Sequence, residues 1–416
     1  MFTGWKVVGA SSFVWALQSM VWMQGYGNLA VELRDRFGWS KTLFSVAFAG
    51  TRAEGALMGP AQGRTIERFG TTAVMRVGAV ISAAGFIALS QINTRTQFVV
   101  VMLATTVGMT MIGFLTISSA TVRWFERKRA RALSLQTMGF AVGGFAGPIV
   151  VAGYRLVGWR WTVALSGLVI GSVAWWASSI VGRTPADTGE PVDGHEIDPE
   201  VEVKRAEGVR DRHFTAEQAI RTRAFWMISL GHGCALLVVS ATMAHLTLYL
   251  TEDRGYSAGS AAVVAGIVPL FQFVGTGVGG YLGDHVNKRL IAGVAMCAHG
   301  LGLLLLTWVD HWTAVAAFVA LHGLAWGARG PQMQAIRADY FGATAFARIM
   351  GWSAMIVTLG SVAGPIAAGA LADSTGDYRL GFTLIASAAL SGVLFWVLAT
   401  PPRFDAAAPE SSPTTA

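Results

Sequence analysis

Residues 40–76 read SKTLFSVAFAGTRAEGALMGPAQGRTIERFGTTAVMR, a segment with two long apolar runs and a polar interval between them. The pattern predicts an apolar helix over Leu43–Gly63, a short polar turn, and a second apolar helix from Thr72. Arg52 comes twelve residues after Ser40, about 18 Å along a helix. That depth is near the middle of a hydrocarbon core about 30 Å thick, where an ionisable side chain is costly and by default marks a functional site.

The composition places this segment in a membrane protein. The 416 residues are 53% hydrophobic and 13% charged, whereas an ordinary soluble domain is about 25% charged. Lys6 precedes an apolar run too long for the core of a cleavable signal peptide. Cys234 and Cys297 stand inside apolar segments and are expected to be small buried hydrophobes. The chain shows no metal-ligand spacing, phosphate loop or nucleophile–base pattern, so we expect no enzymatic activity, no cofactor and no metal site.

Twelve apolar segments have the length of a membrane-spanning helix. Their abundant Gly and Ala residues favour close helix packing in lipid. We therefore predict an all-α membrane protein with two six-helix bundles. The segments are Val7–Ala30, Leu43–Gly63, Thr72–Gln91, Phe98–Val122, Leu133–Gly153, Trp161–Val181, Phe225–Leu250, Ala258–Leu282, Leu290–Val309, Ala314–Ile336, Ile349–Leu371 and Leu380–Ala399.

The polar interval between the two sets predicts the domain organisation. We expect an N-terminal bundle over residues 1–182, a linker over 183–222, a C-terminal bundle over 223–400 and a disordered tail over 401–416. The linker is rich in charge and proline, which predicts disorder in its first part. Thr215 and Gln218 have the spacing of a capping box that opens a short helix before the seventh span.

The basic residues predict the orientation. Of the 31 lysines and arginines, 21 would lie on the side of both termini and the linker, eight on the other side, and two inside spans. The positive-inside rule then places both termini in the cytoplasm, in a bacterial inner membrane. A nucleic-acid site in the basic cluster at Arg123–Arg131 is a less favoured interpretation of the same charge.

An internal repeat relates the two bundles. Gly63 and Glu67 recur in the second half as Gly280 and Asp284, and Gly147-Pro148 recurs as Gly364-Pro365 at the same offset in sequence. A duplicated six-helix unit is the symmetry of a secondary transporter whose two halves rock about a central site.

These motifs resemble those of the major facilitator superfamily. The loop Gly63-Arg-Thr-Ile-Glu67-Arg68-Phe-Gly70 is similar to the family's loop between helices two and three, with Glu67 in place of the usual aspartate. The glycine-proline motif on helix eleven, with a partial copy on helix five, resembles that of the family's antiporters. The residues that carry it, which we expect to serve helix packing, are Gly143, Gly147, Pro148, Gly360, Gly364 and Pro365.

The segment Arg123–Ser134 is similar to the entry of helix five in monocarboxylate transporters and oxalate:formate antiporters. That branch is known for a cationic residue on helix eight that binds the substrate carboxylate. The corresponding span here, Val263–Leu282, has no charged residue, and its candidate for binding the substrate is Gln272. The resemblance implies a secondary transporter of a small organic anion.

Three charges lie inside predicted spans, namely Arg52, Glu54 and Arg329. Arg52 and Glu54 point about 200° apart on one helix, so they cannot form an ion pair with each other. We predict that the arginines bind an anion and that Glu54 carries a proton. The alternative for Arg52 and Glu54 is pairing to a neighbouring helix, and for Arg329 it is a snorkelling or cytoplasmic-gate arginine. With the polar residues of helix one and helix eight, the predicted substrate-binding residues are Arg52, Glu54, Arg329, Gln18, Tyr26 and Gln272.

Four histidines, His232, His245, His299 and His322, also fall in or near spans. Each is expected to bond a neighbouring helix, with a role as a proton relay as the alternative.

The two repeated acidic residues predict a gate between the halves. Glu67 and Asp284 are expected near the N-termini of helices eleven and five, where the helix dipole favours a carboxylate by up to about 1 kcal/mol. Contacts of this kind would latch the cytoplasmic side shut. The predicted gating residues are Gly63, Glu67, Arg68, Gly280, Asp284, Arg131 and Arg348.

The sequence therefore predicts a secondary transporter of a small, monocarboxylate-like organic anion that works by alternating access and couples to protons. Its partners would be the substrate, protons and the lipid bilayer, with no nucleic acid, and the protein is expected to be monomeric. An efflux antiporter for amphiphilic drugs is the first alternative. A non-transporting membrane receptor is the second, although the linker and tail are short for a signalling domain.

Overall fold

The computed structural model describes residues 2–23, 25–194 and 214–402, and within these ranges the chain is helical with no strand. All twelve predicted segments are helical, which confirms the all-α prediction. The first set of helices is α1 (Thr3–Gln18), η1 (Ser19–Met23), α2 (Gly25–Phe37), α3 (Lys41–Ser90), α4 (Arg95–Met111), α5 (Phe114–Trp124), α6 (Arg129–Phe145), α7 (Gly147–Leu156) and α8 (Trp159–Val181).

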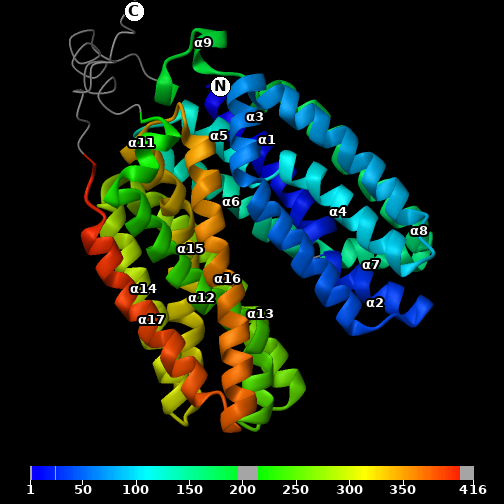
Figure 1. Ribbon diagram of the computed structural model, residues 1–416, viewed down its shortest axis with the longest axis vertical. Coiled ribbons are helices and arrows are strands. Elements are labelled where there is room, and N and C mark those ends of the chain that lie inside the picture. The colour runs from blue at the N-terminus through cyan, green and yellow to red at the C-terminus, as the bar shows by residue number, and fades with distance from the viewer. Residues whose placement is uncertain (1, 24, 195–213, 403–416) are drawn as a thin grey trace, which may run out of the picture.

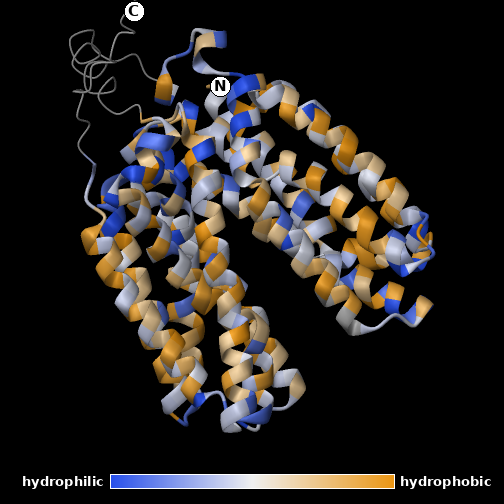
Figure 2. Cartoon of the chain, viewed as in Figure 1, coloured by the Kyte–Doolittle hydropathy of each residue, from blue (hydrophilic) through white to orange (hydrophobic). Residues whose placement is uncertain are grey.

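The second set begins after the linker. It comprises α12 (Arg223–Glu252), α13 (Ala258–His285), α14 (Lys288–Trp308), α15 (Trp312–Phe341), α16 (Phe346–Thr375) and α17 (Arg379–Leu398). Among the described residues, nine helices are long and apolar enough to cross a membrane, and the longest, Val46–Ser90, contains two of the predicted spans. Figure 2 shows apolar residues along the outer faces of both sets, as expected for helices that face lipid.

The two sets form separate halves that meet at one end and diverge toward the other (Figure 1). The N-terminus lies at the end where they meet, which we call the closed end, and the opposite end is the open end. Between the halves, α3 packs against α16 and α6 packs against α13. These four helices therefore line the border between the halves, and we call the region where the halves diverge the cleft region.

The predicted polar turn over Gly63–Gly70 is shorter than expected. The first helix of α3 continues to Phe69, and a kink at Gly70, with φ 78° and ψ 162°, separates it from the second helix. Glycine adopts this positive φ without the steric cost that a Cβ would bring. The gating residues Gly63 and Glu67 are therefore carried rigidly on the end of a helix rather than on a loop.

Two pairs of helices approach closely through the glycines of the repeat. A Cβ at Gly143 of α6 would collide with the carbonyl oxygen of Ala16 in α1, and a Cβ at Gly360 of α16 would collide with that of Gly233 in α12. Ala16 and Gly233 are themselves equivalent positions of the two halves, so the repeat is preserved in the packing. Small residues permit such close approach in a membrane, where van der Waals contact drives helix association.

The symmetry between the two halves is lost one turn after Gly143 and Gly360. Gly364 packs on the carbonyl of Leu237, and Pro365 lies inside the continuous helix α16. In contrast, the helix that carries Gly147 is interrupted, because α6 ends at Phe145 and Pro148 stands in the first turn of α7. A Cβ at Gly147 would meet only the Asn28 side chain, at 3.9 Å. The N-terminal half has a π-helix, η1, at the matching position of its first span, and π-helices are frequent at functional sites.

The expected disorder in the first part of the linker is wrong for residues 184–194. Thr184 and Asp187 form a capping box that opens α9 (Pro185–Thr188), and the turn η2 (Val192–Gly194) follows. The Glu190 carboxylate accepts hydrogen bonds from the Thr3 backbone N–H (2.8 Å) and hydroxyl (2.5 Å), which lower the pKa of Glu190. This contact is therefore lost as the pH falls and Glu190 is protonated.

The second part of the linker agrees with its prediction where it is described. The capping box of Thr215 and Gln218 is confirmed at the start of α11 (Ala216–Arg221). Residues 195–213 of the linker and 403–416 of the tail lie outside the described residues.

Candidate functional site

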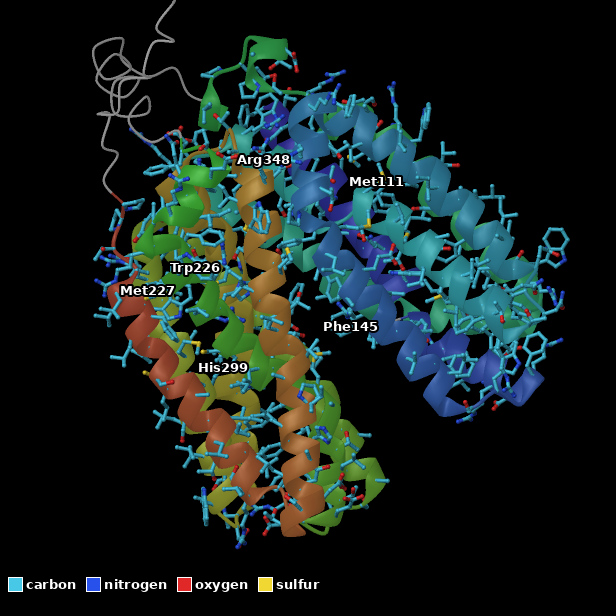
Figure 3. The ribbon with its side chains drawn as sticks, in the orientation of Figure 1. Met111, Phe145, Trp226, Met227, His299 and Arg348 are labelled. Carbon is cyan, nitrogen blue, oxygen red and sulfur yellow. The ribbon has the colours of Figure 1, made fainter. Side chains whose placement is uncertain are left out.

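The closed end is held by ionic contacts between the halves. Glu67 of α3 forms an ion pair with Arg348 of α16, with 2.5 Å between the carboxylate and the guanidinium. Gly63, one turn earlier, lies against the backbone of Arg348, where a Cβ would come within 2.6 Å of the Arg348 Cα. In Figure 3 Arg348 lies where α16 meets the N-terminal half. Any side chain at Gly63 would therefore separate the two helices.

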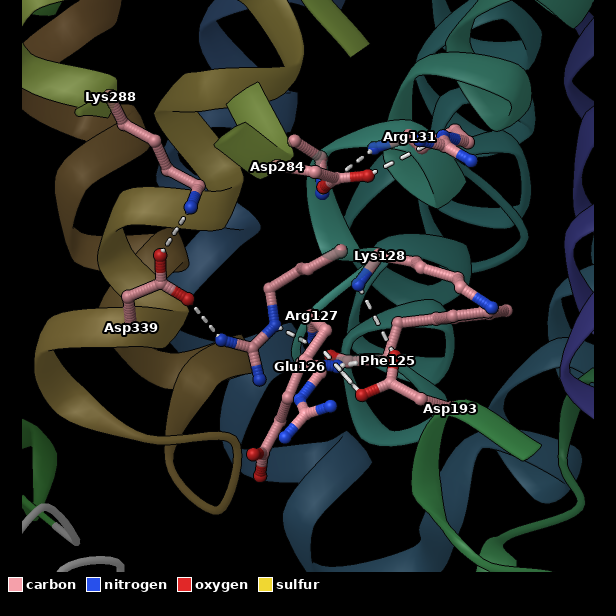
Figure 4. Close-up of polar contacts among 11 residues, drawn as sticks. Phe125, Glu126, Arg127, Lys128, Arg131, Asp193, Asp284, Lys288 and Asp339 are labelled. Carbon is pink, nitrogen blue, oxygen red and sulfur yellow. Dashed lines mark hydrogen bonds and ion pairs between the residues drawn. The ribbon is translucent and has the colours of Figure 1, made fainter. Parts of the chain in front are cut away.

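The repeat places an equivalent contact on the other side of the interface. Asp284 at the end of α13 accepts hydrogen bonds from the backbone N–H groups of Ala130 (2.9 Å) and Arg131 (3.3 Å) in the first turn of α6. Arg131 also pairs with this carboxylate through its side chain, at 3.5 Å (Figure 4). Gly280 packs on Ser134, where a Cβ would come within 2.6 Å of the serine side chain. Asp284 uses the helix N-terminus, whereas Glu67 uses the Arg348 side chain.

A third contact between the halves was missed by the sequence analysis. Asp339 of α15 forms an ion pair with Arg129 of α6 and a second one with Lys288 of α14, at 2.9 Å (Figure 4). Arg129 also donates from Nε to the Phe125 carbonyl, at 2.8 Å. Asp339 has no acidic counterpart in the repeat, because Val122 stands at the equivalent position of the first half. Repeat symmetry therefore carries no signal for this contact.

The linker is bound to the same region. The Asp193 carboxylate accepts hydrogen bonds from the backbone N–H groups of Glu126, Arg127 and Lys128, at 3.0–3.3 Å (Figure 4). Asp193 has φ 62°, in the left-handed region that asparagine and aspartate tolerate better than most residues. These three residues directly precede α6, so Asp193 fixes the segment from which Arg129 and Arg131 reach the other half.

Replacing Asp193 with asparagine should loosen this segment. The amide loses the charge and one of the two acceptor oxygens, so fewer of the three N–H groups keep a strong partner. We expect faster proteolysis of the linker and transport reduced a few-fold. Asp187→Asn is the matched control, because the hydrogen bonds that the Asp187 carboxylate accepts from the described residues lie within the α9 capping box. Equal behaviour of the two variants would contradict this role of Asp193.

Arg52 belongs to a stacked group on the cleft side of the N-terminal half. Its guanidinium lies over the Phe48 ring, 4.9 Å from the centroid, and Phe48 stacks on Tyr26 at 4.9 Å. The Tyr26 hydroxyl donates to the Phe44 carbonyl, at 2.6 Å. Arg52 shares its helix face with Gly59, which lies two turns nearer the closed end and touches Gly351 of α16. The structure thus brings Arg52 and Tyr26 together through Phe48, which the sequence analysis had not selected.

The helices of the protein do not enclose Arg52 in this conformation. Its side chain is exposed, and it lies two turns before Gly59, where α3 meets α16. An arginine that is fixed by an aromatic ring and open to the cleft is placed to meet an anion there.

Glu54 and Gln18 lie within the N-terminal half. Glu54 is half-buried, and its Oε2 atom is buried without a hydrogen-bond partner among the described residues. Gln18 is 4% exposed and donates to the Met109 carbonyl, at 2.5 Å, where the fourth span is interrupted after Met111. The Gln18 amide N–H is therefore used in holding the fold, and in this conformation only its buried Oε1 lacks a partner.

The C-terminal half contains buried cations without carboxylate partners. Arg329 of α15 is 1% exposed, and its Nε and one terminal nitrogen have no hydrogen-bond partner among the described residues. Arg337, also 1% exposed, bonds the Met333 carbonyl and, at 2.6 Å, the Ser353 hydroxyl. Buried cations without a counter-charge are costly, so this part of α15 favours an anion. Arg329 does not reach the open cleft in this conformation.

Two remaining predicted residues stand apart from these groups. Gln272 of α13 is half-buried, and its backbone carbonyl lies against Gly327. Arg68 is exposed and lies over the Phe69 ring, at 5.1 Å, with no ion pair to the other half among the described residues. In this conformation Arg68 therefore does not make the gating contact that we expected at the closed end, among the described residues.

Comparisons with known proteins agree with this arrangement. The sequence profile described as Major Facilitator Superfamily matches residues 10–268 and 228–415. The hexuronate transporter of Escherichia coli strain K12 is 25% identical over 312 residues, which cover 69% of each chain.

Solved structures show the same fold. A point variant of the E. coli fucose:proton symporter FucP superposes with a TM-score of 0.70 at 14% identity, over 95% of this chain and 98% of that one. The human organic anion transporter MFSD10 gives 0.71 at 12% identity, over 95% and 100%. FucP in the outward conformation gives 0.68 at 14% identity, over 95% and 98%.

Proposed function

This chain belongs to the major facilitator superfamily, and on that basis we propose that it is a proton-coupled secondary transporter of a small organic anion with one carboxylate. It is an integral membrane protein and a transporter rather than an enzyme. The observation that carries the anion proposal is Arg52, an exposed cation held over Phe48 on the face of α3 that meets α16 two turns later, at Gly59. Two of the similar proteins named above are a hexuronate transporter and an organic anion transporter, which supports the same substrate class.

The proposed path of the substrate follows the geometry. An anion enters the cleft from the open end and meets Arg52 first, with Tyr26 and Gln272 as further polar contacts. Arg329 joins when the C-terminal half closes around the substrate, because alternating access needs a site that both halves touch. Glu54 is the proposed proton carrier, and the monomer is the proposed transport unit. From the segment that enters helix five, Arg123–Ser134, we also predict that the protein belongs to the monocarboxylate-like branch of the superfamily.

The proposed orientation places the closed end in the cytoplasm of a bacterium, with both termini there, because that end carries most of the basic residues. The conformation is then open to the outside. Glu67, Asp284 and Asp339 bridge the halves at the cytoplasmic gate and must release before the inward-open state forms.

Ligand binding tests the substrate class directly. A ligand that binds only the folded protein stabilises it by about 2.7 kcal/mol at a hundred times its Kd. We expect glucuronate or lactate to raise the melting temperature of the purified protein, whereas amphiphilic cations should not. Stabilisation by the cations alone would favour the efflux antiporter instead.

The gate proposal predicts a shift in conformation. Glu67→Gln and Asp284→Asn each remove a charge from a contact between the halves, so each should raise the inward-open population and slow turnover more than it weakens binding. A cysteine placed in the cleft should label faster from the cytoplasmic side in both variants. Arg68→Gln is the control, since Arg68 makes no such contact here. Unchanged labelling in both carboxylate variants would contradict the gate.

A further inference from the structure

A pair of buried histidines connects two helices of the C-terminal half. His299 of α14 is 0% exposed and His322 of α15 is 1% exposed. Their Nδ1 atoms are 3.1 Å apart, and their ring centroids are 4.7 Å apart. Figure 3 shows His299 among the helices of this half. A hydrogen bond between two Nδ1 atoms requires one ring to donate and the other to accept, so the two rings hold different tautomers.

The surrounding hydrogen bonds assign these tautomers. The Thr242 hydroxyl of α12 has one hydrogen, which is directed to the helix backbone between the carbonyls of Val238 (3.0 Å) and Val239 (3.1 Å), so toward His322 the oxygen offers a lone pair. His322 therefore donates from Nε2 to Thr242, over 3.3 Å, and accepts at Nδ1. His299 in turn donates from Nδ1, which leaves its Nε2 unprotonated. That atom is buried and has no partner among the described residues.

The charges near this nitrogen come from a few groups. Arg329 is seven residues from His322 on the same face of α15, and it acts electrostatically on both imidazoles. On α12, His232 also lies within electrostatic reach of Arg329. Cys234 of α12 and Met296 of α14 both lie beside Gly392 of α17, and Met296 is one turn from His299.

The other helices packed on α14 add no carboxylate at this level. Tyr249 of α12 donates to the Leu306 carbonyl, two turns from His299. Helix α17 has no ionisable side chain after Arg379, and those of α13 are at its closed end. The full charge that acts on both rings is therefore the guanidinium of Arg329, two of whose nitrogens have no hydrogen-bond partner in the part of the chain that the structure describes.

We propose that His299 Nε2 is a second proton-binding site, which retains its proton only while an anion occupies Arg329. With Arg329 unpaired, a proton on His299 would place two like charges in a medium of low dielectric constant. A bound carboxylate neutralises Arg329 and removes that repulsion. By linkage, the proton then strengthens anion binding as much as the anion strengthens proton binding. This inference rests on the proposed function, because it needs an anion at Arg329.

The step moves only one proton. His299 Nε2 takes a proton from solvent as the anion arrives and becomes an imidazolium, while its Nδ1–H bond to His322 is kept. The proton is lost again when the anion leaves Arg329. No other bond forms or breaks.

The test measures the pH dependence of glucuronate affinity in purified full-length protein, by thermal shift and by proton uptake in weakly buffered solution. One linked proton changes the affinity about tenfold per pH unit. In His299→Asn the side-chain amide keeps the donor toward His322 but has no nitrogen at the Nε2 position. We expect this variant to lose about one proton of uptake per anion and the corresponding slope of affinity against pH.

His245→Asn is the matched control. Both ring nitrogens of His245 have partners, the Tyr378 hydroxyl and the Pro365 carbonyl, each at 3.0 Å, so its replacement should leave the slope unchanged. Should His299→Asn not fold, His299→Gln is the second variant, because its side-chain amide does not titrate either, and the same loss of slope is expected.

The outcomes separate the two proposals. The histidine site alone is overturned if the variant that folds keeps the wild-type slope of glucuronate affinity against pH. It is also overturned if the wild-type protein binds glucuronate with no pH dependence. If neither glucuronate nor lactate binds the wild type, or Arg329→Gln binds them unchanged, the anion proposal at Arg329 fails and the histidine site fails with it.

Discussion

Arg52→Lys is expected to reduce uptake of a labelled sugar acid or monocarboxylate by about 10- to 100-fold, with the protein still folded. A guanidinium offers a carboxylate two parallel hydrogen bonds, and an ammonium offers a point charge. The loss of one charge-assisted hydrogen bond, about 1.5–3 kcal/mol, accounts for a change of this size. Stacking on Phe48 strengthens the argument, because the planar guanidinium is held in place over the ring and the lysine side chain would not be.

Uptake into proteoliposomes measures this effect, and the melting temperature shows that the variant is folded. Arg68→Lys is a close control, because Arg68 lies on the same helix, is also exposed and also covers a phenylalanine ring, but is remote from the cleft side. Arg329→Lys should give a smaller loss, since Arg329 lies nearer the closed end and outside the open cleft. Normal transport by Arg52→Lys, or a cationic substrate, would refute the anion proposal.

Glu54→Gln is expected to abolish accumulation driven by a pH gradient while exchange of substrate for substrate continues. The reason is the unpartnered, buried Oε2 atom of Glu54. A carboxylate that locked two helices together would have a partner there, and its neutralisation would leave that partner unpaired. Because no such partner is present among the described residues, the amide should be tolerated, and the loss should fall on proton coupling.

Counterflow and pH-driven uptake in the same vesicles separate the two activities. Glu32→Gln serves as the control, because the pair of Glu32 with Arg36, at 3.8 Å, is a surface contact within α2 that contributes little. Loss of both activities in Glu54→Gln, together with a lowered melting temperature, would show that Glu54 has a structural role instead.

The contacts at the closed end show which features of the structure the sequence repeat predicts and which it does not. The repeat places Glu67 and Asp284 at equivalent positions, and both touch the opposite half. It also relates the close approaches at Gly143 and Gly360. It says nothing about Asp339 or Asp193, because each binds its partner through a contact that only one half possesses.

The sequence by itself determined the membrane class, the twelve helical segments, the duplicated architecture and the superfamily. These properties depend on composition and local periodicity, since in lipid every backbone polar group must be satisfied within a helix. The three ionisable residues inside spans were also visible from the sequence, because such residues are rare at that depth.

The tertiary structure alone decided what surrounds each of these residues. Arg52 is exposed because the helices of the protein do not enclose it in this conformation, and Arg329 is buried because α15 turns that face into its own half. The stack on Phe48 and the pair of His299 with His322 join residues that a pattern within one helix does not relate. Side-chain environments depend on how separate helices are packed, and that packing is set by contacts distant in the sequence.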